Sequence, residues 1–234
     1  RKYGRWQLKA ADTQLPDTIN AVLIARIDRL ADQVKEVVKA AAVIGREFEI
    51  VLLSAMLKGD VLSQVQIIRK AQIWEEVREL HYMFKHALLR DIAYGMQLKS
   101  RLRQLHQLTA ETMETLYAAN LAKHYADLAF HYERAEIRDK AIEYLEKAGD
   151  DAKAQYQHRQ ALTFYDRLLS QLQNVFSFPG KEIDALVKKG EILELIGEWK
   201  ACRQVYEEAL SLSEQIGNPP RAVGLVKRAL GIIS

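Results

Sequence analysis

The side chains with chemical potential in this 234-residue sequence are few and scattered. His124 and His131 are seven residues apart and can share one helix face, but two imidazoles without a third ligand make a poor metal site. A single cysteine, Cys202, excludes an internal disulfide and a thiolate-rich metal site. Lys99 and Ser100 lack the preceding glycines of a phosphate-binding loop. These observations predict a segment with no catalytic residues and no metal site of its own.

Composition and charge narrow the class of protein. The chain is 49% hydrophobic and 28% charged, which is typical of a globular protein. Its net charge is +3, so no general nucleic-acid or membrane surface is indicated. The longest apolar run, residues 40–44, is far shorter than the ~20 residues that cross a bilayer. Because both ends look cut, we expect a segment excised from a longer cytoplasmic protein.

The first hundred residues predict short helices followed by a hairpin. Apolar residues at helical spacing, punctuated by Gly45 and Gly59, predict helices at about residues 16–30, 33–44, 48–56 and 61–71. Residues 73–77 and 80–84 are rich in β-branched and aromatic types, which predicts two short strands joined at 78–79. The last three of these helices followed by a two-stranded ribbon have the order of a winged-helix-like domain.

The remaining sequence predicts helices alone. They are expected at about residues 85–97, 99–117, 119–134, 138–156, 158–173, 182–196 and 199–216, with a last helix starting near Arg221. The predicted fold class is therefore mainly α: a winged-helix-like domain with a short two-stranded wing, followed by an α-solenoid of TPR-like helical hairpins. The predicted divisions are a junction at 1–31, the winged-helix-like domain at 32–97, connecting helices at 98–137 and the repeat array at 138–234.

Small and large residues recur as in tetratricopeptide (TPR) repeats, where small residues let paired helices approach and large ones fill the gaps. The clearest unit has Gly190, Leu193, Gly197, Trp199, Cys202, Tyr206 and Ala209 at these positions. Gly231 restarts the pattern 41 residues after Gly190. Leu128, Ala129 and Tyr132, followed by Ala141, Leu145 and Ala148, predict another hairpin. Ala161 follows Ala141 by only 20 residues, so the array is expected to be irregular in the middle.

The predicted array offers candidate partner-binding positions on its helices. By analogy with TPR grooves these are Lys123, Phe130, Asp184, Glu191 and Glu194. The alternative for each is a solvated helix face, and the alternative for the whole array is an ordinary helical bundle.

A winged helix also raises the possibility of DNA binding through its third helix. Residues 61–71 offer Gln64, Gln66, Arg69 and Lys70, a mixture that also suits a solvated face.

Several stretches resemble one family. Residues 15–30 and 40–48 resemble the junction downstream of the nucleotide-binding domain in STAND-type signalling ATPases. Residues 84–94, FKHALLRDIAY, resemble the F-x-H-x-L-x-R-D-x-x-Y stretch that follows the wing in that family. Residues 103–106 and 148–152 also resemble this group, so the resemblance covers about residues 15–234.

The resemblance implies a relay mechanism. An ATPase core that binds ATP or ADP would precede Arg1, and the winged helix would hold the ADP-bound state closed. Related proteins often carry a class III adenylate or guanylate cyclase domain, or a LuxR-type DNA-binding domain. By position in the motif, His86 is the candidate ADP phosphate sensor, although Ala87 stands where the related motif has aspartate. The alternative for His86 is packing at the junction between wing and helix.

The expected function is a regulatory, protein-interaction segment of a STAND-type ATPase. Its expected partners are a protein or small-molecule effector on the array and the upstream nucleotide-binding domain, with no nucleic acid and no membrane. The alternatives are a stand-alone TPR adaptor and a winged-helix transcription regulator.

Overall fold

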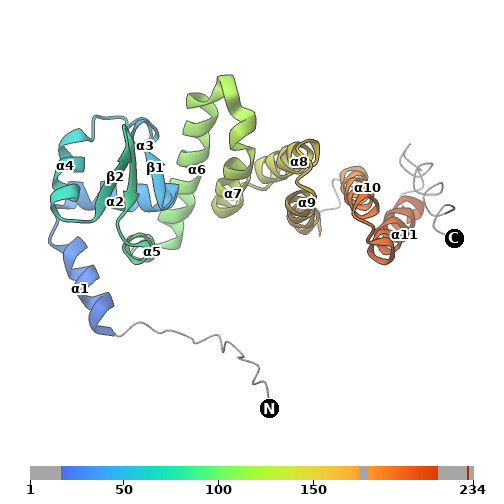
Figure 1. Cartoon of the computed structure of the whole chain (residues 1–234), viewed down its shortest axis with the longest axis horizontal. Helices are drawn as coiled ribbons and strands as arrows, with labels where there is room; N and C mark the ends of the chain where they lie inside the picture. Colours follow the sequence, from blue (N-terminus) through green and yellow to red (C-terminus); the bar gives the residue numbers. More distant parts are fainter. Residues whose placement is uncertain (1–16, 174–178, 216–230, 232–234) are drawn as a thin grey trace, which may run out of the picture. The chain divides into compact units, whose positions relative to one another are not determined.

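The chain forms two compact units, divided between Leu98 and Lys99. The computed structural model describes residues 17–173, 179–215 and 231 (Figure 1). The first unit contains α1 (Asp17–Asp28), α2 (Asp32–Ile44), β1 (Glu47–Glu49), α3 (Ile50–Leu57), α4 (Leu62–Lys70), β2 (Trp74–Arg78), β3 (His81–Phe84) and α5 (Ala87–Gly95). None of the described helices combines the length and apolarity needed to span a bilayer.

The core of the first unit is built where its small sheet meets its helices. The three strands are antiparallel in the order β1-β3-β2. Each strand contributes one buried aromatic ring: Phe48 from β1, Trp74 from β2 and Phe84 from β3. Trp74 meets Phe48 and Phe84 edge-on, with ring centroids 4.8 and 5.8 Å apart, a favourable aromatic geometry. Strand β1 and the β2–β3 hairpin, which are far apart in the sequence, therefore converge on one cluster.

The structure corrects two details predicted for this unit and confirms a third. Phe48, expected in a short helix, lies in β1, which adds a third strand to the predicted hairpin. Helix α3 ends with Lys58 in the left-handed conformation (φ 52°), and Gly59 follows that residue. Gly45 is the C-cap of α2, as predicted, and in an extended conformation its N–H donates to the Ala41 carbonyl.

The second unit is a succession of helices, each packed on the next. It contains α6 (Lys99–Leu116), the 3₁₀ helix η1 (Ala118–His124), α7 (Tyr125–Ala135), α8 (Arg138–Ala154), α9 (His158–Leu172), α10 (Pro179–Leu195) and α11 (Trp199–Gln215). The predicted helix at 119–134 begins as η1, because Asn120 is not helical (φ −144°, ψ 37°). The helix expected from Arg221 lies outside the described residues.

The array is regular where the sequence predicted irregularity. Gly149, Ala161 and Tyr165 on α8 and α9 are each followed, 41 residues later, by Gly190, Cys202 and Tyr206 on α10 and α11. A side chain on Gly149 would lie 2.7 Å from Cε1 of Tyr165, and one on Gly190 would overlap the ring of Tyr206. Each glycine therefore lets a tyrosine ring lie against the backbone of the preceding helix. The 20-residue spacing between Ala141 and Ala161 is the spacing between successive helices, α8 and α9. It therefore corresponds to half a repeat.

Candidate partner-binding surface

Polar side chains connect alternate helices of the array. Helices α6, α8 and α10 form one set, joined through Glu114 on α6, Lys140 and Tyr144 on α8, and Lys188 on α10. These links determine which side chains of the set remain available to a partner.

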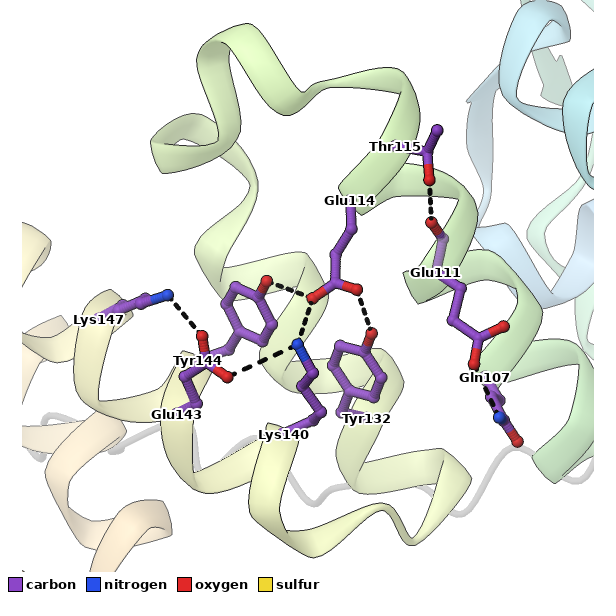
Figure 2. A network of polar contacts seen from close by, with 9 residues as sticks. All are labelled: Gln107, Glu111, Glu114, Thr115, Tyr132, Lys140, Glu143, Tyr144 and Lys147. Carbon is purple, nitrogen blue, oxygen red and sulfur yellow. Dashed lines mark hydrogen bonds and ion pairs between the residues drawn. The ribbon is translucent and has the colours of Figure 1, made fainter.

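Glu114 is the centre of the network that joins α6, α7 and α8 (Figure 2). Its carboxylate accepts hydrogen bonds from the Tyr132 hydroxyl at 2.8 Å, from the Lys140 ammonium at 2.9 Å and from the Tyr144 hydroxyl. The rings of Tyr132 and Tyr144 stack, with centroids 5.6 Å apart and an interplanar angle of 5°. Three helices are thus held together by one acceptor group.

The electrostatics of Glu114 follow from these contacts. Burial alone would raise the pKa of the carboxyl, but the hydrogen bonds from Tyr144, Lys140 and Tyr132 outweigh it, and the net result is a lowered pKa. Burial, followed by the bond to Glu114, raises the pKa of both tyrosines. The carboxylate is therefore ionised and fully engaged at neutral pH, which suits a structural role.

A second set of ion pairs joins α8 to α10. The Lys188 ammonium lies 2.8 Å from carboxylate oxygens of both Glu146 and Asp150. Lys153 pairs with Glu191 in the opposite direction, from α8 to α10. All five side chains keep part of their surface exposed, so the ladder is accessible to solvent and to a partner.

The cysteine offers no reactive thiol. Cys202 is buried, as its position in the repeat predicted, and its Sγ donates a hydrogen bond to the Gly190 carbonyl at 3.5 Å. Burial, followed by the negative charge of Glu194, raises the pKa of the thiol, which disfavours the nucleophilic thiolate.

The histidines pair differently from the sequence expectation. His131 lies against His106 rather than His124, with their Nδ1 atoms 2.9 Å apart and both rings buried. His124 instead stacks on Tyr117, with centroids 4.1 Å apart. The His106–His131 contact fastens α6 to α7.

The five predicted partner-binding residues differ in their exposure and in their contacts. Lys123, in η1, and Asp184, on α10, are exposed, whereas Glu191 is engaged by Lys153. Phe130 packs edge-on against the buried His106, with centroids 5.7 Å apart. Glu194 is half-buried on α10. The structure therefore leaves Lys123 and Asp184 as the most accessible members of the predicted set.

His86 lies at the start of α5 in the first unit. It is the residue before the first helical position, with φ −128° and ψ 133°, and its side chain makes no capping hydrogen bond. The side chain is exposed. His86 is thus placed where an imidazole and the helix N-terminus face solvent together.

The structure shows an apolar surface that the sequence analysis missed, at the turns between paired helices. Tyr156, between α8 and α9, is 83% exposed. At the equivalent turn between α10 and α11, Leu195 is 64%, Trp199 53% and Ile196 39% exposed. We call these four residues the turn patch. The sequence predicts that Trp199 packs within the repeat, whereas about half of its surface is exposed to solvent.

A cavity of about 440 Å³ adjoins the turn patch. Tyr156 and Leu195 line it together with His158, whose Nδ1 is buried without a hydrogen-bond partner among the described residues. Asp150 and Lys153 lie on its border, so the ion pairs from α8 reach the same cavity. The 41-residue spacing between Tyr156 and Gly197, both with positive φ, was the sequence signal that would have aligned the two turns.

Comparison with known proteins gives a likeness among solved structures only at low identity. No protein-family model matches the chain, and no curated protein matches it. Among solved structures, the chain is similar to a STAND protein with a tetratricopeptide repeat sensor from Pyrococcus horikoshii, at 13% sequence identity. The similarity covers 92% of this chain and 49% of that one, so this chain spans about half its length. The TM-score is 0.32, which is too low to establish a shared fold.

Proposed function

We propose that the helical array is a protein-interaction surface, and that the chain is a regulatory segment of a larger cytoplasmic signalling protein. The observation that carries the proposal is the turn patch beside its cavity. Exposed tyrosine, tryptophan and leucine in one place are the residue types that anchor protein partners, and clustered apolar exposure marks interaction sites. The ion-pair ladder on α8 and α10 supplies a polar border.

The test is to change the turn patch and measure which proteins remain bound. Tyr156→Ser combined with Leu195→Ser removes two exposed apolar side chains without touching a buried residue. Leu62→Ser, which changes a leucine that is 51% exposed on α4, is the matched control. A specific partner captured from the source cells should lose at least about tenfold in affinity with the double variant, the range expected for anchor residues, and nothing with the control. Equal recovery with all three proteins contradicts the proposal.

The proposed role of the first unit is that of a winged-helix relay next to a nucleotide-binding domain. The order α2, α3, α4 and then the β2–β3 hairpin supports this, with β1 as a third strand. His86 supports it as well, because a free imidazole beside exposed helix N–H groups suits an ADP phosphate presented by a neighbouring domain. On this proposal ATP and ADP bind the longer protein and not this segment.

The proposed relay senses the nucleotide bound by a neighbouring domain, whereas a stand-alone adaptor does not. His86→Ala in the longer protein should shorten ADP retention, whereas His81→Ala, on β3 of the same unit, should leave it unchanged. Unaltered retention in both variants would favour the adaptor.

A DNA-binding role receives less electrostatic support. Glu75, Glu76 and Glu79 lie on or beside β2, next to the basic end of α4, and Arg69 is already paired with Glu76 at 3.1 Å. The Arg69 guanidinium is therefore already engaged by a carboxylate and is not free to contact a DNA phosphate.

A further inference from the structure

Strand β2 presents an unpaired edge in the first unit. Because the strand order is β1-β3-β2, β2 has β3 on one side only. After the buried Trp74, its residues Glu75 to Arg78 are all exposed. An exposed strand edge is a template for a further strand.

The register shows which backbone groups face outward. The Lys85 N–H donates to the Ile73 carbonyl at 2.9 Å, and hydrogen-bonded pairs alternate with non-bonded pairs in an antiparallel ladder. The pairs Trp74–Phe84 and Glu76–Tyr82 are therefore non-bonded pairs, and a register shift between Glu76 and Arg78 interrupts the regular ladder after them. In agreement with this register, the Phe84 N–H points away from β2 and donates to the Arg46 carbonyl at 2.9 Å.

The N–H and C=O groups of Trp74 and Glu76 accordingly point away from β3. Outside the β2–β3 ladder, no backbone hydrogen bond to either residue is formed within the part of the chain that the structure describes. Glu76 is the more accessible of the two, because its side chain is 36% exposed whereas Trp74 is 2% exposed.

A groove runs beside this edge. Its volume is about 630 Å³, and it lies between β2 and the end of α4, where Gln66, Arg69 and Lys70 line it; Lys85, after β3, lines it as well. Trp74 also lines the groove, and its indole Nε1–H is buried with no acceptor among the described residues. The groove is thus lined by a residue with one unused side-chain donor, the indole N–H of Trp74.

The charges in the groove favour an acidic occupant. Arg69 is paired with Glu76, and Lys85 is engaged by Gln72, but Lys70 makes no ion pair within the described ranges. Glu75 lines the same groove, so the lining contains three cations, Arg69, Lys70 and Lys85, and two carboxylates, Glu75 and Glu76. The net charge of the lining is therefore positive.

We propose that this edge binds an extended segment of a partner protein, which adds as a strand to β2. Main-chain hydrogen bonds to Glu76 and Trp74 would supply affinity, and an acidic side chain on the α4 side would meet Lys70. This surface lies in the first unit and is independent of the turn patch. It therefore gives the segment a second contact with a protein.

A defined peptide tests the proposal on the whole 234-residue chain. The probe has nine residues in which glutamate alternates with threonine, with acetylated and amidated ends and a fluorescent label. A matched peptide has lysine in place of glutamate. Fluorescence anisotropy should show tighter binding of the acidic peptide. On binding, amide exchange at Glu76 should slow and the indole N–H signal of Trp74 should shift.

Two variants at one position isolate the backbone group. Glu76→Ala removes the side chain and keeps the N–H, whereas Glu76→Pro also removes the N–H. Proline is tolerated at an edge where the N–H faces outward, so both variants should fold. Glu76→Pro should bind the acidic peptide about tenfold more weakly than Glu76→Ala, since an outward main-chain hydrogen bond is lost.

A charge exchange keeps the test informative if the proline variant fails to fold. Lys70→Glu should weaken binding of the acidic peptide and strengthen binding of the lysine peptide. Equal binding by Glu76→Pro and Glu76→Ala overturns the proposal, as does a wild-type chain that binds both peptides equally or neither. Protection of Glu76 from exchange supports it.

Discussion

In the first unit, buried side chains far apart in the sequence meet in one cluster, whereas in the second each helix packs mainly on its neighbours. Phe48, Trp74 and Phe84 come from three strands and share one core. Gly149 and Tyr165, by contrast, belong to successive helices, and their contact recurs in the next repeat. The first unit should therefore unfold as a whole, whereas the array should lose structure locally, as repeat proteins do.

Truncating the aromatic cluster is expected to have the largest effect. Phe84 is fully buried, so Phe84→Ala should destabilise the first unit by about 3–5 kcal/mol. Circular dichroism during heating should then show early loss of this unit and an unchanged transition for the array. Leu62→Ala, at an exposed position, is the control and should change stability by less than about 0.5 kcal/mol. Unfolding of both units in a single thermal transition would contradict the expectation that they unfold independently.

Filling the space over a repeat tyrosine should have a smaller and more local effect. Gly190→Ala places a methyl group within the ring of Tyr206, so it should destabilise α10 and α11 by about 1–3 kcal/mol. Amide exchange should accelerate in these helices and not in α6 and α7.

The Gly190→Ala experiment needs two further variants: a control substitution at another glycine, and a smaller side chain in place of Tyr206. Gly180→Ala is the control, because its added carbon meets nothing within 4 Å. Tyr206→Leu should relieve part of the cost of Gly190→Ala, which a double-mutant cycle can measure. Strict additivity would show that the glycine is not there to admit the ring.

Neutralising Glu114 should give the smallest effect, and one that depends on pH. Since folding lowers the pKa of this carboxyl from 4.5, its contribution is complete above pH 4.5 and is lost as the pH falls through the lower folded value. Glu114→Gln should therefore cost about 1–2 kcal/mol at pH 7 and little in acid.

Urea unfolding at several pH values measures this dependence. Glu111→Gln, at an exposed position one turn away on α6, serves as the control. A cost for Glu114→Gln that stays constant down to acid pH would mean that the carboxylate charge is not what joins the three helices.

The sequence predicted most helices because their periodicity is a local property. It missed β1, because three residues are too few to show alternation, and Phe48 reads equally well in a helix. It also missed the regular period of the array. The clue was Gly149, whose role is visible only when Tyr165 from the next helix is placed against it.

The binding surfaces were less predictable than the fold. Glu114 looks like any charged helical residue until Tyr132, Lys140 and Tyr144 converge on it from two other helices. The predicted Glu191 is a natural groove position, but its charge is engaged by Lys153 across the array. Exposure of Tyr156 depends on a turn conformation that the sequence signals only through its equivalence with Gly197.

The 41-residue period also has a genetic consequence. Each repeat brings its own glycine and its own tyrosine, so in-frame duplication or deletion of 41 codons would change the length of the array and keep every ring matched to its gap. The first unit has no such freedom, since the removal of any one strand would take a member from its aromatic cluster. Evolution can thus vary the reach of the array while the first unit stays constant in size.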